Sequence, residues 1–240
     1  MKALSELLLS TNGLTKQYGH HKAVDKVNLH IKKGAIYGFI GRNGAGKTTC
    51  LKMISGLARP TAGEIEMFGC KGKELERIRS RVGCLIEAPG LYGNMNAYTN
   101  LKIKCELFGI RKKGYIEDIL ETVGLEGVGK KKTKHFSLGM KQRLGIGLAL
   151  VGEPDLLVLD EPINGLDPQG IAEVRDTIQR LRDERNMTIL ISSHILEELG
   201  HMATMYCFIH KGHILENITK RELDERCRQH MDIRVNNIPQ

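Results

Sequence analysis

The sequence predicts an α/β fold built on a mainly parallel sheet, and two observations support this. Short apolar runs of strand length alternate with segments of helical periodicity, as in strand–helix–strand units. Residues 89–151 depart from that alternation because helical spacing dominates there, and we interpret them as a helical insertion. The 240 residues suffice for one large domain or two small ones, with a substantial core.

The first strands surround a glycine-rich loop. Residues 27–31 alternate apolar and polar side chains, which predicts a half-buried strand. Residues 35–40 form an apolar run of buried-strand length that leads directly into the loop. A helix is expected over residues 48–57, closed by Gly56, and residues 64–68 alternate again as a strand.

The second half of the chain continues the same pattern. Residues 156–159 are an apolar run that predicts a buried strand. A helix is expected from Pro168 to Arg185, with Asp167 as its N-cap. Residues 188–192 predict another buried strand, and residues 206–216 predict a hairpin.

The composition limits the class of protein only broadly. The formal net charge of +8 fits nucleic acid, an anionic ligand, an anionic membrane surface, or solvated surface charge. The six cysteines form no C-x-x-C pair, which indicates neither a zinc site nor a redox motif and suits a reducing cytosol. No apolar run reaches the roughly 18 residues of a membrane span, so a second chain would have to supply any membrane part.

The glycine-rich loop predicts a triphosphate site, because it fits the pattern G-x-x-x-x-G-K-[ST]. Backbone N–H groups of such a loop surround phosphate oxygens, and the following helix adds its positive N-terminal dipole. Lys47 is expected to reach the β- and γ-phosphates, and Thr48 to offer its hydroxyl to Mg²⁺. The predicted nucleotide-binding residues of the loop are Gly41, Arg42, Asn43, Gly44, Ala45, Gly46, Lys47, Thr48 and Thr49.

Three further residues stand at the ends of predicted strands. Asp160 ends one strand and is placed to hold Mg²⁺ beside the loop. Glu161 follows it and is expected to polarise an attacking water. His194 follows the strand at 188–192, and a residue there faces the ligand crevice of an α/β sheet. Together with Lys47, Glu161 and His194 are the predicted catalytic residues.

A second anion-binding helix start is predicted at Ser137, which is a good N-cap. With this segment, the ordered motifs resemble the nucleotide-binding subunit of ATP-binding cassette (ABC) transporters over residues 7–220. The resemblance implies a P-loop NTPase with a RecA-like core, an N-terminal antiparallel β subdomain and an inserted α-helical subdomain. The implied limits are 1–88 and 152–220 for the core, 89–151 for the helical subdomain and 221–240 for a C-terminal extension, which is often longer in related exporter ATPases.

The resemblance also implies roles for residues outside the loop. Ser137 and Gly139 match the segment that reaches the ATP of a partner copy, whereas Leu138 and Met140 depart from the commonest form of that motif, LSGGQ. The resemblance implies that Ser137, Gly139 and Met140 face the partner's ATP. Tyr18 stands where the family places an aromatic side chain against adenine. Asp167 belongs to the loop that couples the two sites of a head-to-tail dimer, and His194 matches the histidine that senses the γ-phosphate.

Glu87 marks a departure from the family, which usually has glutamine at this position. A carboxylate there can still ligate Mg²⁺, so the expected metal ligands are Thr48, Glu87 and Asp160. The glutamate form resembles the ATPases of bacitracin- and lantibiotic-type peptide export and immunity systems. Residues 87–110 are then expected to contact an integral-membrane permease.

The expected function is therefore that of an ATP- and Mg²⁺-dependent subunit that powers a separate permease. We expect a cytoplasmic protein on the inner face of the membrane that dimerises with itself on binding ATP and does not bind nucleic acid. Two alternatives are a non-transport ABC ATPase acting on nucleic acid or ribosomes, and a cytosolic ATPase without a permease. The chain lacks the long heptad segment of chromosome-maintenance ATPases and the second cassette usual in ribosomal factors.

Overall fold

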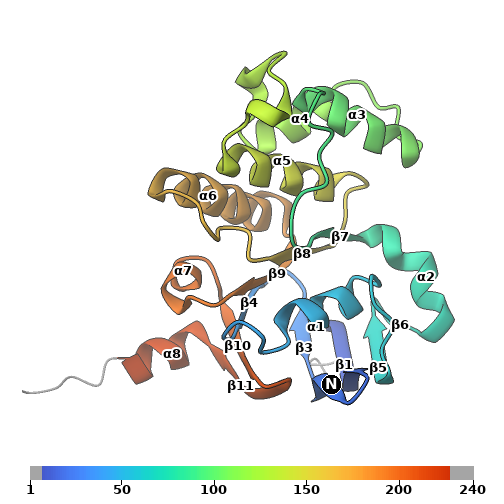
Figure 1. The fold of residues 1–240 in the computed structure, drawn as a ribbon, viewed down its shortest axis with the longest axis vertical. Coiled ribbons are helices and arrows are strands. Elements are labelled where there is room, and N and C mark those ends of the chain that lie inside the picture. The colour runs from blue at the N-terminus through green and yellow to red at the C-terminus, as the bar shows by residue number, and fades with distance from the viewer. Residues whose placement is uncertain (1–6, 228–240) are drawn as a thin grey trace, which may run out of the picture.

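The computed structural model describes residues 7–227, which form two sheets and a group of helices (Figure 1). The first sheet is antiparallel, with strand order β2-β1-β5-β6 and β3 paired with β1. Its strands are β1 (Leu7–Tyr18), β2 (His21–Val27), β3 (His30–Lys32), β5 (Ala62–Met67) and β6 (Cys70–Lys71). The strand predicted over residues 27–31 is interrupted between β2 and β3. There the carbonyl of Val27 accepts a hydrogen bond from the Thr11 hydroxyl, and the backbone of Leu29 also bonds to Thr11.

The second sheet has six strands in the order β11-β10-β4-β9-β8-β7, and every neighbouring pair is parallel except β10 and β11. The strands are β4 (Ile36–Ile40), β7 (Val82–Leu85), β8 (Leu156–Asp160), β9 (Thr188–Ser193), β10 (Met205–His210) and β11 (His213–Thr219). This sheet confirms the predicted α/β class and the C-terminal hairpin.

The two faces of the parallel sheet belong to different cores. On β8, Leu156 and Val158 pack in one core with α1 (Lys47–Ile54) and the antiparallel sheet. Leu157 and Leu159 alternate with them and pack in the other core with the remaining long helices. Because side chains of a strand alternate between faces, a fully apolar strand such as β8 is expected where both faces are covered.

The helices of the insertion gather at one end of the molecule, at the top of Figure 1. They are α3 (Ala97–Leu107), α4 (Tyr115–Thr122) and α5 (Leu138–Leu150), all within the predicted segment 89–151. The α5 helix packs against α6 (Pro168–Arg185), whose bounds and Asp167 cap are as predicted. The remaining α-helices of the described residues are α2 (Leu75–Ile78), α7 (Leu196–Gly200) and α8 (Lys220–Cys227). Of the predicted extension 221–240, residues 228–240 lie outside the described range.

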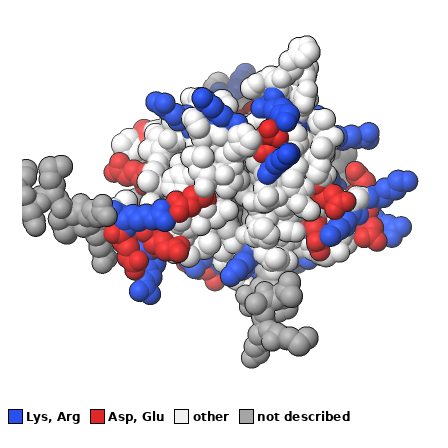
Figure 2. Space-filling model, turned by 90° about the horizontal axis from the view of Figure 1, so that it is seen from below, with Lys and Arg blue, Asp and Glu red and all other residues white. Residues whose placement is uncertain are grey.

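The charges are interspersed on the face that Figure 2 shows, where Lys and Arg side chains lie beside Asp and Glu side chains. Ion pairs among the described residues include Arg226 with Glu216 and Lys71 with Glu66. Within residues 7–227, the helices lack the combination of length and apolar character that a bilayer span requires.

Candidate functional site

The predicted site residues follow the carboxyl ends of three neighbouring parallel strands. The glycine-rich loop follows β4, Glu161 follows β8 and His194 follows β9, which lies between the other two strands. In the pairing of β8 with β9, Asp160 lies opposite Ser192. In an open α/β sheet the ligand crevice lies at this edge of the strands.

The loop itself lines a cavity of about 390 Å³ with Tyr18, and two of its glycines are required by close packing. A Cβ atom on Gly41 would lie 2.5 Å from the carbonyl oxygen of Ile209. Gly46 has φ +106° and directly precedes α1, where a Cβ atom would lie 2.4 Å from the carbonyl oxygen of Ala23. Only glycine fits such positions without displacement of the backbone. The cavity-lining residues are Tyr18, His21, Ala23, Asn43, Gly44, Ala45, Gly46, Lys47, Thr48, Thr49, Glu161 and Asn164.

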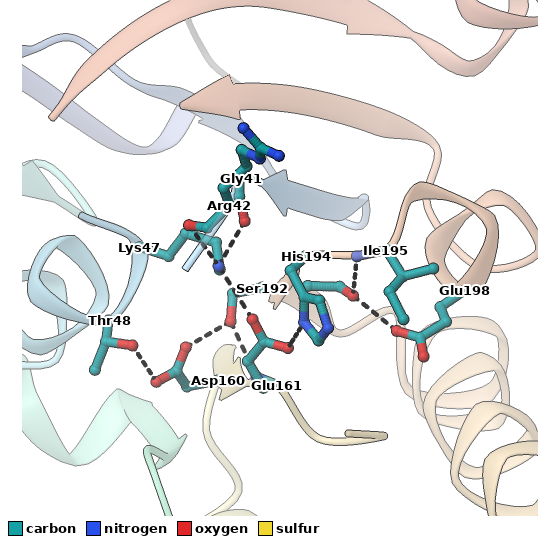
Figure 3. Close-up of polar contacts among 11 residues, drawn as sticks. Gly41, Arg42, Lys47, Thr48, Asp160, Glu161, Ser192, His194, Ile195 and Glu198 are labelled. Atoms are coloured by element: carbon teal, nitrogen blue, oxygen red, sulfur yellow. Dashed lines mark hydrogen bonds and ion pairs between the residues drawn. The ribbon is translucent and has the colours of Figure 1, made fainter. Parts of the chain in front are cut away.

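Lys47 is held inside this loop. Its residue is 5% exposed, and Nζ donates hydrogen bonds to the carbonyl oxygens of Gly41 at 2.6 Å and Arg42 at 3.4 Å (Figure 3). The same Nζ atom lies 3.1 Å from Oε1 of Glu161. The ammonium is therefore fixed at the cavity wall, with a carboxylate as its counter-charge.

Asp160 and Thr48, two of the three predicted metal ligands, lie side by side in the structure. The hydroxyl of Thr48 donates to Oδ2 of Asp160 at 2.7 Å, which joins the start of α1 to the end of β8. Oδ1 of Asp160 accepts a hydrogen bond from the Ser192 hydroxyl at 2.5 Å, and Ser192 Oγ accepts one from the Glu161 backbone N–H. Sequence reasoning missed Ser192, because its role depends on the pairing of two strands that are distant in the sequence.

Glu161 lies between Lys47 and His194, the histidine predicted to sense the γ-phosphate, and contacts both. Its Oε2 atom lies 2.7 Å from Nδ1 of His194, while Oε1 faces Lys47 (Figure 3). The backbone of Glu161 has φ +49°, in the left-handed region that residues other than glycine seldom adopt. Strained backbone of this kind persists where the surrounding structure fixes it, and it is common at functional sites.

Glu87 points to a different partner. Its Oε1 atom accepts a hydrogen bond from Lys52 Nζ at 2.5 Å, and its side chain is 65% exposed. The bond to Glu87 raises the pKa of Lys52, so this ammonium stays charged. Among the described residues, no polar contact joins Glu87 to Thr48 or Asp160, and its place among the Mg²⁺ ligands stays a prediction.

The predicted dimer residues lie apart from this cavity in the described part of the chain. Ser137 caps α5 by accepting a hydrogen bond from the Met140 N–H at 3.2 Å. Gly139 lies against α6, where a Cβ atom would be 3.4 Å from the Cα of Gly170. Asp167 caps α6 in the same region. One chain thus brings together the phosphate loop, Asp160, Glu161, His194 and Tyr18, but not the Ser137 segment.

This fold and this arrangement define an ATP-binding cassette. Residues 24–164 match the family model described as ABC transporter, and the chain belongs to that family. Membership makes it an ATP-binding subunit that hydrolyses ATP to power transport, as the sequence predicted.

Two proteins are similar to the chain in sequence, and one solved structure is similar to it in fold. The chain is 49% identical to the bacitracin transport ATP-binding protein BcrA of Bacillus licheniformis, and the match covers 95% of this chain and 75% of the relative. It is 46% identical to the lantibiotic transport ATP-binding protein SrtF of Streptococcus pyogenes, over 87% of this chain and 89% of that one. The ATP-binding cassette MJ0796, solved as a dimer in a post-hydrolysis state with ADP and Pi, shares the fold: its TM-score is 0.78 at 24% identity, over 89% of this chain and 99% of that one.

Proposed function

We propose that this chain is the ATPase of a system that exports, or gives immunity to, antimicrobial peptides of the bacitracin or lantibiotic type. The proposal rests on the 49% sequence identity to BcrA over 95% of the chain. Similarity to SrtF supports the same substrate class. Both relatives are named transport ATP-binding proteins, which favours transport over action on nucleic acid or ribosomes.

Lys47, Glu161 and His194 are suited to separate roles in ATP hydrolysis. A γ-phosphate would compete with Glu161 for the Lys47 ammonium, which lies 3.1 Å from that carboxylate. Once displaced, the carboxylate would still be oriented by His194, 2.7 Å from its other oxygen, and would accept a hydrogen bond from the attacking water. We assign Glu161 as the general base, Lys47 as the group that offsets phosphate charge, and His194 as the sensor of the γ-phosphate.

Mg²⁺ is the expected metal, and the residues present fit it. Thr48 and Asp160 offer oxygen atoms that already lie 2.7 Å apart, and oxygen is the donor that Mg²⁺ prefers. Ser192 holds the other carboxylate oxygen and would fix its orientation. When bound, the metal offsets the negative charge of the phosphates. We retain Glu87 as a third ligand, which would have to leave Lys52 to reach the metal.

Two copies are proposed to close on ATP in a head-to-tail dimer. Ser137 and Leu138 are exposed, Met140 is half-buried and Gly139 is buried against α6, and none of the four lines the cavity of its own chain. A two-fold arrangement would place Ser137, Gly139 and Met140 of each copy against the ATP of the other. Asp167, at the start of α6, would link the two sites, and Tyr18, which is 52% exposed, would stack on adenine.

A membrane permease is the proposed partner of residues 87–110, on the cytoplasmic inner face of the membrane. This segment carries large apolar side chains in contact with solvent: Leu107 is 80% exposed, Tyr92 55% and Phe108 46%. Such a patch marks an interaction surface more often than chance exposure does. Movement of the dimer would be transmitted through it.

Peptide susceptibility tests the proposed substrate class. Deleting the gene in its own organism should lower the inhibitory concentration of bacitracin or of a lantibiotic severalfold, because the peptide is no longer removed. Resistance should return with the wild-type gene and not with a Lys47→Met variant, whereas susceptibility to an aminoglycoside should stay constant. Unchanged susceptibility to every peptide of this class would refute the substrate assignment.

Replacing Glu87 with glutamine tests its predicted role as a metal ligand. Glu87→Gln should keep ATP affinity within about threefold, since an exposed ion pair contributes little, and should raise the Mg²⁺ concentration needed for half-maximal hydrolysis. Nucleotide affinity is measured with a fluorescent ATP analogue, and Mg²⁺ is titrated separately. Outright loss of nucleotide binding would contradict this assignment.

A further inference from the structure

The ion pair between Lys52 and Glu87 lies one helical turn from the predicted metal site. Lys52 follows Thr48 by four residues on α1, so the two side chains share one face of the helix, with Cβ atoms about 5–6 Å apart. The Nζ atom of Lys52 donates a hydrogen bond to Oε1 of Glu87 at 2.5 Å. The carboxylate of Glu87 is thus held close to Thr48 but bound to a different group.

The Lys52 ammonium is near enough to the metal site to interact with its charges. The hydrogen bond to Glu87 is the main cause of the raised pKa of Lys52, and the carboxylate of Asp160 raises that pKa further. Among residues 7–227, Lys52 is the one ion-pair partner of Glu87. Lys52 is therefore a cation within electrostatic reach of two carboxylates that are both predicted metal ligands.

These two carboxylates differ in how firmly they are held. Asp160 is 4% exposed, and its two oxygens accept hydrogen bonds from Thr48 and Ser192. The side chain of Glu87 is 65% exposed and that of Lys52 is 32% exposed. An exposed ion pair contributes little free energy, so it opens at a small cost. Glu87 is therefore the ligand whose position can change, and Lys52 is the group that it would leave.

The backbone at Glu87 is also unusual. Its φ of +66° lies in the left-handed region that residues other than glycine seldom adopt. Such conformations are kept where the surroundings fix them, and they are common in switch regions as well as at active sites. Among the polar contacts of the described residues, the bond from Lys52 is the one that holds the Glu87 side chain.

We propose that Lys52 is a positioning residue, which binds Glu87 while the metal is absent and competes with Mg²⁺ for its carboxylate. The proposal rests on the assignment of Glu87 as a metal ligand, made above, and adds the residue that controls this ligand. Glu87 would exchange the ammonium for the metal while Thr48 and Asp160 stay in place. The apparent affinity for the metal is then lowered, because only molecules with the pair open offer all three ligands.

The exchange depends on the charge that Glu87 adds to this position. The glutamine that the family usually has there is neutral and would offer Lys52 only a neutral acceptor. Hydrogen bonds between two ionised groups are stronger than those to a neutral one, so Lys52 would hold a glutamine less firmly. Competition between an ammonium and a metal for one carboxylate is thus expected where this glutamate and this lysine occur together.

The Lys52 ammonium could also oppose the metal through its charge alone, without any contact to Glu87. Like charges repel across this short distance, and loss of the ammonium would then favour metal binding whatever residue stands at position 87. The two effects differ in whether they require the Glu87 carboxylate. A double-mutant cycle over Lys52 and Glu87 separates them.

Mn²⁺ is the probe for this cycle, because the electron paramagnetic resonance signal of free Mn²⁺ reports how much metal is bound. The full chain is loaded with one equivalent of a non-hydrolysable ATP analogue. Lys52→Met should bind Mn²⁺ about two- to fivefold more tightly than the wild type, the range expected for an exposed ion pair. Lys52→Arg keeps the pair and should bind as the wild type does. In a chain that carries Glu87→Gln, Lys52→Met should change the affinity no further.

Lys71→Met is the matched control, because it removes the same charge from the exposed pair with Glu66 in the antiparallel sheet. Its affinity for Mn²⁺ should equal that of the wild type. A folding defect would weaken metal binding, so it cannot account for tighter binding by Lys52→Met. If Lys52→Met does not fold, Lys52→Gln repeats the measurement.

Two results would overturn the proposal and leave Glu87 as a ligand. One is equal tightening by Lys52→Met with and without Glu87→Gln, since the ammonium would then act through its charge alone. The other is unchanged affinity in Lys52→Met together with weaker binding in Glu87→Gln. Unchanged affinity in both single variants would refute the control by Lys52 and the ligand assignment of Glu87 together.

Discussion

The Glu161→Gln variant should bind ATP as the wild type does and hydrolyse it about 10²–10⁴-fold more slowly, as expected for loss of a general base. An amide keeps the size of the side chain but cannot accept the proton of an attacking water. It also removes the carboxylate that lies 3.1 Å from Lys47, so the phosphates would no longer compete for that ammonium. Nucleotide affinity should therefore be equal or higher, and phosphate release measures the rate.

The matched control is Glu216→Gln, which changes a glutamate of β11 that pairs with Arg226 outside the nucleotide cavity. It should hydrolyse ATP at the wild-type rate. If Glu161→Gln hydrolysed ATP at the wild-type rate, Glu161 would not be the general base, and another group would have to activate the water.

Replacing Lys47 with methionine should weaken ATP binding by about 10- to 100-fold, the range expected for loss of charge-assisted hydrogen bonds. Methionine preserves most of the volume of the 5% exposed lysine, so the loop should keep its shape. The lost ammonium would leave the phosphates facing Glu161 without a counter-charge. Binding is measured by titration with a fluorescent ATP analogue.

Lys71→Met is the control for that variant, because Lys71 forms an exposed pair with Glu66 in the antiparallel sheet. It removes the same charge from the chain and should leave affinity unchanged. A thermal unfolding midpoint equal to that of the wild type would show that Lys47→Met is folded. Normal ATP affinity in a folded Lys47→Met variant would contradict the assignment of the loop.

The sequence could predict features that local rules determine. Asp167 and Pro168 specify the start of α6 through N-cap and first-turn preferences, and the structure begins the helix there. Apolar runs that end in Asp160 or lead into Gly41 are recognisable because both faces of their strands are buried. Lys47, Glu161 and His194 lie close together because the phosphate loop, Glu161 and His194 each follow the carboxyl end of a parallel strand.

Features that depend on contacts between distant segments could not be predicted in the same way. Ser192 hydrogen-bonds to Asp160 because β9 pairs with β8 in a particular register, and no local sequence pattern predicts that register. Glu87 could be identified as a departure from the family, but its pairing with Lys52 depends on how the segment after β7 meets α1.

Each nucleotide site is proposed to be completed by a second copy of the chain. The molar mass of the Glu161→Gln variant in solution, measured by light scattering during size-exclusion chromatography with and without ATP, tests it most directly. With ATP and Mg²⁺ the mass should be twice the 26.8 kDa of one chain, and it should return to that of one chain without ATP or with Ser137→Arg added. A single-chain mass at saturating ATP, with nucleotide bound, would contradict the composite site.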